Sequence, residues 1–284
     1  MQKQKPAFLA TLGAFVATAA FAQAVPPRFE VASIKPLAVR GPAMIRQLPG
    51  RLTADAPLRA LLQTAYDLPP FQIAGGPEWV DSEPYEIDAK SAGNPGRGQM
   101  LVMLQLLLLD RFQLRFHRES RDVPVYVLGA ARGGFKLPAP QDGSCVEGSE
   151  DLLGPLAIPG ARIAIAGPGP ASASGCGALD LTIGPGGARI RGGKVTMPGL
   201  VRVLSRVLGR TVIDQTGFAG VFDVKLDFQG DDTTPALPPP PPGAEPAPAV
   251  SIFSAVQQLG LRLESKRGAA EVLVIDHVER PSAN

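Results

Sequence analysis

Apolar and polar residues alternate with the same phase in two stretches of the chain. Residues 112–128 (FQLRFHRESRDVPVYVL) align without a gap on residues 259–275 (LGLRLESKRGAAEVLVI). Alternation with a period of two predicts strands that bury one face. We therefore expect each stretch to form a β-hairpin that closes a small structural unit, with the first turn near residues 120–122.

The patterns ahead of these two stretches predict the same series of elements twice. In the first half they are a strand at 29–34, a helix opened by Pro57 and Leu58, strands at 71–73 and 85–89, and a helix over 99–109. In the second half they are a strand that leads through Val195 into a helix ended by Gly209, strands at 211–213 and 221–228, and a helix capped by Ser251. The sequence thus predicts an α+β fold of two tandem β-α-β-β-α-β-β modules, with helices packed on small mixed sheets.

The helix expected over residues 99–109 contains the run MLVMLQLLLL and is apolar almost all round. It is too short to cross a bilayer. A helix that is apolar on every side is normally buried on more than one side. We therefore expect this helix to lie between the sheet of its own module and a neighbouring element.

Composition suggests the domain boundaries. Residues 23–130 and 188–284 are globular in character and are expected to hold the two modules. Residues 131–187, rich in Gly, Pro and Ala, predict a linker, and the Pro-rich sequence within residues 230–250 predicts an extended loop of the second module. Both insertions are expected to be disordered.

Residues 1–22 have the three parts of a secretory signal peptide. Lys3 and Lys5 precede an apolar run over residues 7–21, and Ala20 and Ala22 are the small residues that a signal peptidase reads. We expect an exported protein, periplasmic or secreted, with no integral membrane span after cleavage. Loss of both lysines would bring the formal net charge from +2 to near zero. The remaining cations are scattered among acids, so we expect no nucleic-acid partner.

The only two cysteines, Cys145 and Cys176, lie in the expected linker. In an exported protein an even pair of cysteines indicates a disulfide. Neither histidine lies near a cysteine in the sequence, and no CxxC spacing is present, so a metal or redox role for the cysteines is not favoured.

Candidate catalytic residues are few. His117 alternates in phase opposite to the apolar positions of its strand and is expected to face solvent or a partner. Asp276 is not expected to orient His277, because adjacent strand residues point to opposite faces. Motifs for a nucleophile elbow, a phosphate loop or a zinc site are absent. We expect no catalytic residues, metal, cofactor or enzyme activity. Two alternatives stay open, which are an envelope hydrolase using His117 or His277 and a small-ligand (glycan) binding protein, each using a cleft between the modules.

Trp79, the only tryptophan, follows a Gly-Gly-Pro turn. Tryptophan is enriched at interface hot spots, so Trp79, like His117, is a candidate partner-binding residue. The interpretation that we favour for Trp79 is that its ring closes the end of the module core. Free edges of the small sheets offer strand addition to a partner.

Four ordered motifs carry a resemblance to a known family. They are GGPEWVDSEPYEIDAK at residues 75–90, LLLLDRFQLRFHRESRDVPVYVL at 106–128, VIDQTGFAGVFDVKLDF at 212–228, and the sequence from LGLRLES to the end at 259–284. In these motifs the chain resembles the acidobacterial Soli_cterm family of exported proteins of unknown function. The resemblance implies export. Some relatives are associated with membrane metallopeptidases of the antibiotic-sensor type, which implies a sensory or accessory role. The resemblance identifies no catalytic residues.

Each half is also loosely similar to the short N-terminal domain of secretins and TonB-dependent receptors, most clearly over residues 194–275. In those proteins the domain docks other proteins in the periplasm. From both resemblances we expect a non-enzymatic module of the cell envelope that docks envelope proteins, a membrane metallopeptidase sensor among the candidates.

Overall fold

The computed structural model describes residues 27–38, 41, 43–147, 175–184, 187–235, 237 and 250–282. The expected signal peptide, most of the expected linker and most of the Pro-rich loop lie outside these residues. The described part is a mixed α+β structure, mostly strands, with a few helices on small sheets. Within it, no helix is both long enough and apolar enough to span a membrane.

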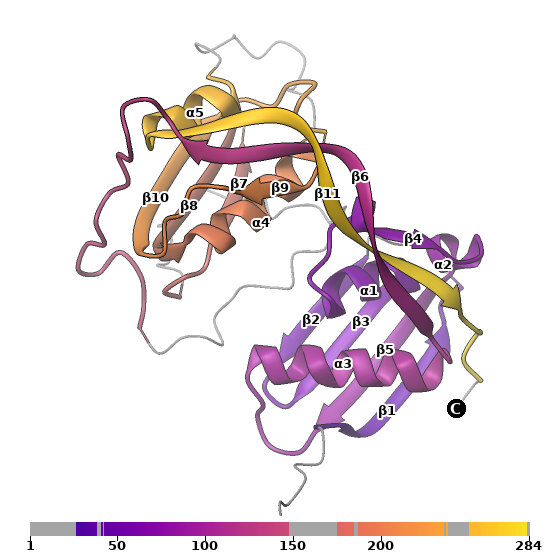
Figure 1. Cartoon of the computed structure of the whole chain (residues 1–284). Helices are drawn as coiled ribbons and strands as arrows, with labels where there is room; N and C mark the ends of the chain where they lie inside the picture. Colours follow the sequence, from indigo (N-terminus) through magenta and orange to yellow (C-terminus); the bar gives the residue numbers. More distant parts are fainter. Residues whose placement is uncertain are drawn as a thin grey trace, which may run out of the picture.

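The first lobe is built on a four-stranded antiparallel sheet in the order β1-β5-β3-β2. Its strands are β1 (Phe29–Pro36), β2 (Met44–Leu48), β3 (Arg51–Pro57) and β5 (Pro84–Ser91). Its other elements are α1 (Leu58–Ala65), the 3-10 turn η1 (Pro70–Gln72), β4 (Ile73–Gly75), α2 (Trp79–Ser82) and α3 (Arg97–Arg111). The sheet buries every second residue of β5, with Tyr85, Ile87 and Ala89 almost inaccessible. Figure 1 shows α3 lying across one face of this sheet.

The second lobe repeats part of this plan on a sheet in the order β10-β8-β7. Its elements are β7 (Asp180–Gly184), β8 (Gly187–Thr196), α4 (Met197–Leu208), β9 (Val212–Asp214), β10 (Val221–Phe228) and α5 (Ile252–Gln258). The Thr196 hydroxyl accepts a hydrogen bond from the Gly199 N–H and caps α4, whose C-terminus is Gly209 at φ +61°. Ser251 caps α5 in the same way. Strand β7 falls in the segment that composition assigned to the linker.

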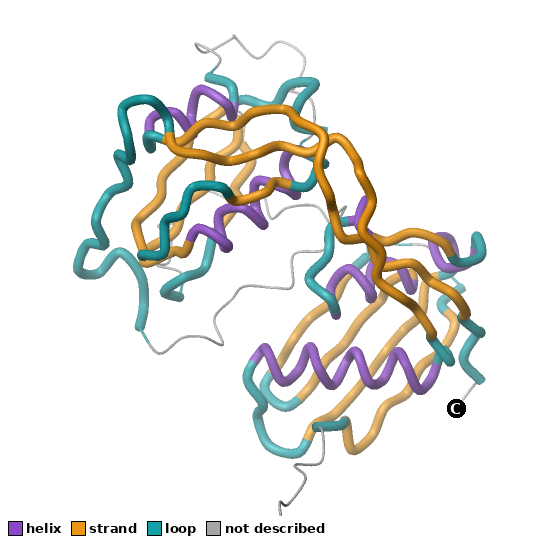
Figure 2. The backbone as a smooth tube through the Cα atoms, in the orientation of Figure 1, coloured by secondary structure: helices purple, strands orange, loops and turns teal. Residues whose placement is uncertain are grey.

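The two predicted hairpins are wrong. Residues 112–128 and 261–278 do not turn back on themselves, because β6 (Arg115–Ala130) and β11 (Leu261–His277) are each one continuous strand. The two strands pair antiparallel along their whole length. Figure 2 shows them running side by side from one lobe to the other. We call this pair of strands the ribbon.

The ribbon exchanges the second arm of each expected hairpin between the lobes. Leu273 of β11 pairs with Ile73 of β4, and Tyr126 of β6 pairs with Val212 of β9. Tyr126 and Leu273 are equivalent positions in the sequence repeat. The third sheet, in the order β4-β11-β6-β9, therefore joins both lobes. Neither half of the chain closes with a hairpin of its own.

Opening the hairpins is possible because the two copies of the repeat carry the same alternation. An arm supplied by the other copy makes the same ladder bonds and buries the same face. The expected turn, Ser120-Arg121-Asp122, also has no glycine, which a tight two-residue turn would favour at its positive-φ positions.

Two main hydrophobic cores result, and each includes residues of a strand that enters from the other half of the chain. The first core, around α1, α3 and the first sheet, contains Leu273 and Ile275 of β11. The second core, around α4, α5 and the second sheet, contains Tyr126 and Leu128 of β6. Burial of these side chains ties each lobe to the ribbon, since apolar burial contributes about 25 cal/mol per Å².

Candidate functional site

Trp79 is covered rather than exposed. The side chain lies on α2 and only 9% of the residue surface is accessible. Its ring packs edge-on against Tyr85, with centroids 6.3 Å apart. The Arg280 guanidinium lies 5.0 Å from the Trp79 ring centroid and is held by Glu83 at 2.7 Å. The candidate role of Trp79 as an exposed anchor is therefore not supported, and the packing role that we favoured fits this geometry.

His117 lies on the outer surface of the ribbon, with its side chain 51% exposed. Its Nδ1 is 2.8 Å from Oδ1 of Asp276, and its Nε2 is 3.6 Å from Oε2 of Glu119. The hydrogen bond to Asp276 raises the pKa of His117. The pairing register shifts between Ile275 and His277, so Asp276 sits at an irregularity of the strand, as residues that are re-aimed by a bulge do.

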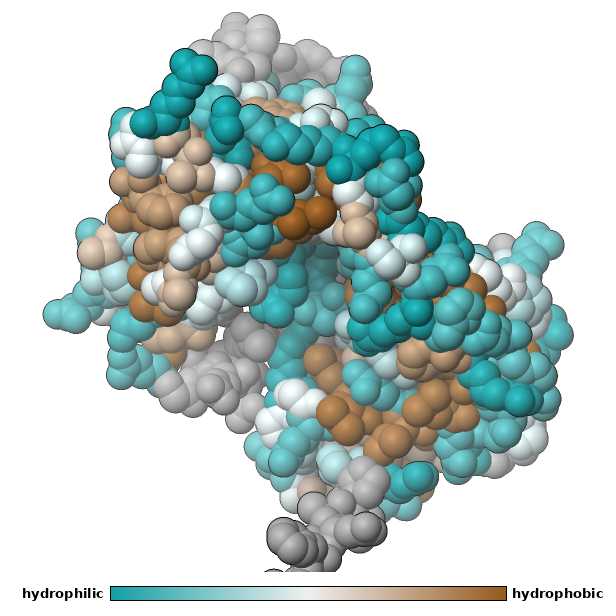
Figure 3. Space-filling model, in the orientation of Figure 1, coloured by the Kyte–Doolittle hydropathy of each residue, from teal (hydrophilic) through white to brown (hydrophobic). Residues whose placement is uncertain are grey.

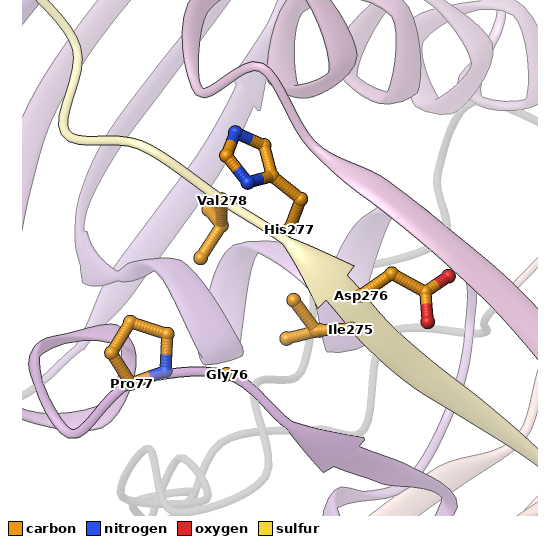
Figure 4. A pocket seen from close by; sticks show the side chains of 6 residues that line it. All are labelled: Gly76, Pro77, Ile275, Asp276, His277 and Val278. Atoms are coloured by element: carbon orange, nitrogen blue, oxygen red, sulfur yellow. The ribbon is translucent and has the colours of Figure 1, made fainter.

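His277 points away from Asp276, as expected for neighbours on a strand (Figure 4). Its Nε2 is 2.9 Å from Oε1 of Glu279. Together with Gly76, Pro77, Ile275, Asp276 and Val278, His277 lines a shallow, open pocket of about 350 Å³.

In the described part of the chain, the hydrogen-bond partners of both imidazoles are carboxylates. The histidines are thus placed as exposed ion-pair members. Over the same residues, no group of three or more His, Cys, Asp or Glu side chains could hold a metal ion.

The Sγ atoms of Cys145 and Cys176 lie 2.05 Å apart, at disulfide distance. Next to them, Val146 and Gly175 form an isolated β-bridge. The Asp223 carboxylate accepts hydrogen bonds from the Gln141 N–H and the Ser144 hydroxyl, so this segment is attached to the second lobe at β10.

Helix α3 presents an apolar face to solvent. Met100, Leu104 and Leu108 are fully buried, whereas Val102 and Leu109 are 39% and 36% exposed. Leu106, one turn from Val102, is half-buried. Apolar residues gather over α3 on the surface shown in Figure 3. We call Val102, Leu106 and Leu109 the α3 outer face. Helix α1 packs beside α3, where the Gln105 amide donates to the Ala65 carbonyl oxygen. Among the described residues, this neighbouring element leaves the α3 outer face at least partly accessible.

A charged contact joins the two lobes. Asp67, which follows α1, forms an ion pair with Arg206 of α4 and lies 3.6 Å from Arg202 on the same helix. Nearby, the Gln72 amide donates to the Thr211 hydroxyl at 3.2 Å. Arg206 is the less exposed of the two α4 arginines, with 33% of its side chain accessible against 60% for Arg202.

Arg97, the first residue of α3, belongs to the same group. Burial lowers its pKa, the charges of Arg206 and Arg202 lower it further, and Asp67 opposes them. We call Arg97, Arg202 and Arg206 the junction arginines. The junction arginines were not predicted, because along the sequence the cations are scattered among acids. The one available signal was the spacing of Arg202 and Arg206, one turn apart on a helix.

The family described as "Protein of unknown function (DUF3738)" matches residues 59–278. This match runs from α1 to just beyond β11 and includes the ribbon, the α3 outer face and the junction arginines. No curated protein and no solved structure matches the chain.

Proposed function

The chain belongs to the DUF3738 family, whose function is unknown, and we propose that it is an exported, non-enzymatic protein that docks a protein partner in the cell envelope. The α3 outer face carries this proposal. Its three apolar side chains recur at the spacing of one helix face, with Val102 and Leu109 exposed and Leu106 half-buried. Apolar patches of this kind on a folded surface mark interaction sites.

The energetics fit a docking surface rather than a core left incomplete. The inner residues of α3, such as Leu104 at 0% exposure, already anchor the helix. Covering the remaining exposed part of Val102 or Leu109 would contribute about 0.5–1 kcal/mol each, as a fraction of the roughly 1.5–3 kcal/mol for full burial. A partner helix or strand with a matching apolar face would gain this energy on binding.

In this proposal the two lobes are two copies of one α+β module that have exchanged their terminal arms. The resemblance of each half to the short N-terminal domain of secretins and TonB-dependent receptors supports a docking role, because that domain docks proteins in the periplasm. The resemblance to the Soli_cterm family adds a membrane metallopeptidase sensor as a candidate partner. The expected signal peptide supports export.

The hydrolase alternative would use His117 or His277. Their contacts in the described residues are with Asp276, Glu119 and Glu279, which provides acid partners but no adjacent nucleophile. The small-ligand alternative has one observation in its favour, the charge at the lobe junction, and this observation favours an anion over a neutral glycan.

Site-specific photo-crosslinking tests the docking proposal. A photoreactive side chain at Val102 is compared, in cells that export the chain, with one at Val221 of β10, a valine of similar exposure at 47%. We expect a discrete crosslinked protein from Val102, none from Val221, and loss of the product when Leu109→Glu is added. The same product from both positions, or no product from Val102, would contradict the proposal.

A further inference from the structure

The junction between the lobes collects more positive than negative charge. Arg202 and Arg206 of the second lobe flank the single carboxylate of Asp67, and Arg97 of the first lobe is near enough to feel the charges of all three. Arginine stays protonated at any ordinary pH. The group therefore has an excess of cationic charge that Asp67 alone does not neutralise.

The contacts within the group are unequal. Arg206 pairs directly with one Asp67 oxygen, and Arg202 lies 3.6 Å from the other. Arg97 has no ion pair with an acidic residue in the described part of the chain, although it is partly buried and feels the charges of both α4 arginines. Like charges gathered in a partly desolvated place repel one another. An additional anion would relieve this repulsion.

The backbone at Asp67 is also unusual, since its φ is +52°. Residues other than glycine rarely adopt this left-handed conformation, and Asp and Asn are among those that tolerate it best. This conformation holds the Asp67 carboxylate at the end of α1, within reach of α4. Asp67 thus acts as an internal anion that occupies part of the arginine group.

We propose that the junction arginines bind a small tetrahedral dianion, of the phosphate or sulfate class, in competition with Asp67. The planar guanidinium fork suits such oxygens because it donates two parallel hydrogen bonds. Arg97 and Arg202 supply the N–H donors, because they make the weakest contacts with Asp67. Because the donors come from both lobes, a bound dianion joins the lobes in addition to the ribbon. This site is separate from the α3 outer face. A failure of the anion-binding proposal would therefore not contradict the docking proposal, and the reverse also holds.

Calorimetric titration of the mature protein with inorganic phosphate tests the site, with chloride used to keep the ionic strength constant. We expect saturable binding by the wild-type chain. Arg97→Gln and Arg202→Gln should each weaken it roughly ten-fold to a hundred-fold, as expected for loss of a charge-assisted hydrogen bond. Arg189→Gln is the matched control, because Arg189 is an exposed arginine that pairs with Asp227 on the second sheet. It should leave binding unchanged.

Asp67→Asn provides the sharpest result. Asparagine accepts the left-handed backbone but removes the competing charge, so phosphate should bind more tightly to this variant. Circular dichroism shows whether each variant is folded. If Arg97→Gln does not fold, Arg97→Lys replaces it. Because lysine keeps the positive charge, Arg97→Lys should weaken phosphate binding less than is expected for Arg97→Gln. Absence of saturable binding by the wild type would overturn the proposal. Weaker binding by Asp67→Asn, or equal weakening by Arg189→Gln, would overturn it as well.

Discussion

Asp122 of β6 lies directly opposite Ala269 of β11, and the two residues occupy the same position of the sequence repeat. A pairing of equivalent positions places a local two-fold axis at that point of the ribbon. The ribbon is therefore complementary to itself, with each lobe on one side of the axis. The position at which the sequence predicts a turn is the centre of a continuous pair of strands.

The contact between β4 and β11 predicts a difference between two glycine substitutions. Gly75 has φ +75°, and a Cβ there would lie 2.9 Å from the Ile275 carbonyl oxygen. Gly93 has φ +64°, and a Cβ there would have no neighbouring atom within 4 Å. Gly93→Ala should cost about 1–2 kcal/mol through backbone strain, and Gly75→Ala should cost a further 1–3 kcal/mol because the strands must separate. Urea unfolding measures both, and equal losses would argue against the β4–β11 pairing.

The two faces of α3 predict a second pair of results. Leu104→Ala removes a fully buried side chain of the first core, and should lower the free energy of unfolding by about 2–5 kcal/mol. Val102→Ala, at a position 39% exposed, should change it by about 0.5 kcal/mol or less. A large loss for Val102→Ala would mean that the outer face stabilises the fold, and would weaken the docking proposal.

The His117–Asp276 pair predicts a pH effect. The hydrogen bond to Asp276, aided by Glu119, raises the pKa of His117 above the ordinary value of about 6.5. The contribution to stability is present below the unfolded-chain pKa and is lost as the pH rises through the folded-state pKa. Because the pair is exposed, salt should reduce this contribution to stability. NMR titration of the His117 ring should show the raised pKa, and Asp276→Asn should return it toward the ordinary value. An unchanged titration in that variant would contradict the assignment.

The disulfide predicts a stability difference between oxidised and reduced protein. Cys145 and Cys176 are separated by 31 positions in the sequence. In the chain-entropy description, closing a loop of this length stabilises the fold by about 3–4 kcal/mol. Urea unfolding with and without reductant measures the difference, and the Cys145→Ser/Cys176→Ser variant should match the reduced wild type. Identical midpoints in both states would show that the bond does not constrain the unfolded chain.

Local features of the fold could be predicted from the sequence. The Gly209 end of α4 and the Ser251 cap of α5 follow from capping chemistry, which depends on a few neighbouring residues. The alternation within β5 predicted its buried face for the same local reason. The α+β class followed from the order of these elements.

The exchange of strands could not be predicted, because a local and an exchanged arm satisfy the same alternation. Tyr126 is buried in the second core and Leu273 in the first, yet neither environment requires a different residue type. The junction arginines were missed for a related reason, since Arg97 and Arg202 meet only after the lobes are placed. The α3 outer face could not be located from the sequence, because apolar residues on all sides of a helix do not reveal which side stays uncovered.

The ribbon, made by exchange between the two halves, fixes the lobes and so assembles the junction. Ser120 and Glu271 are opposite each other in the ribbon, within the Cα separation of about 4.5–5.5 Å that a disulfide can bridge. Glu119 and Val123 would be opposite each other in a local hairpin, but on one extended strand they are about 13 Å apart.

The most direct measurement is therefore disulfide mapping by mass spectrometry on the monomeric Ser120→Cys/Glu271→Cys and Glu119→Cys/Val123→Cys variants. If the strands are exchanged, an intrachain bond forms between positions 120 and 271 and none forms between positions 119 and 123. A bond between positions 119 and 123, with none between 120 and 271, would contradict the exchange.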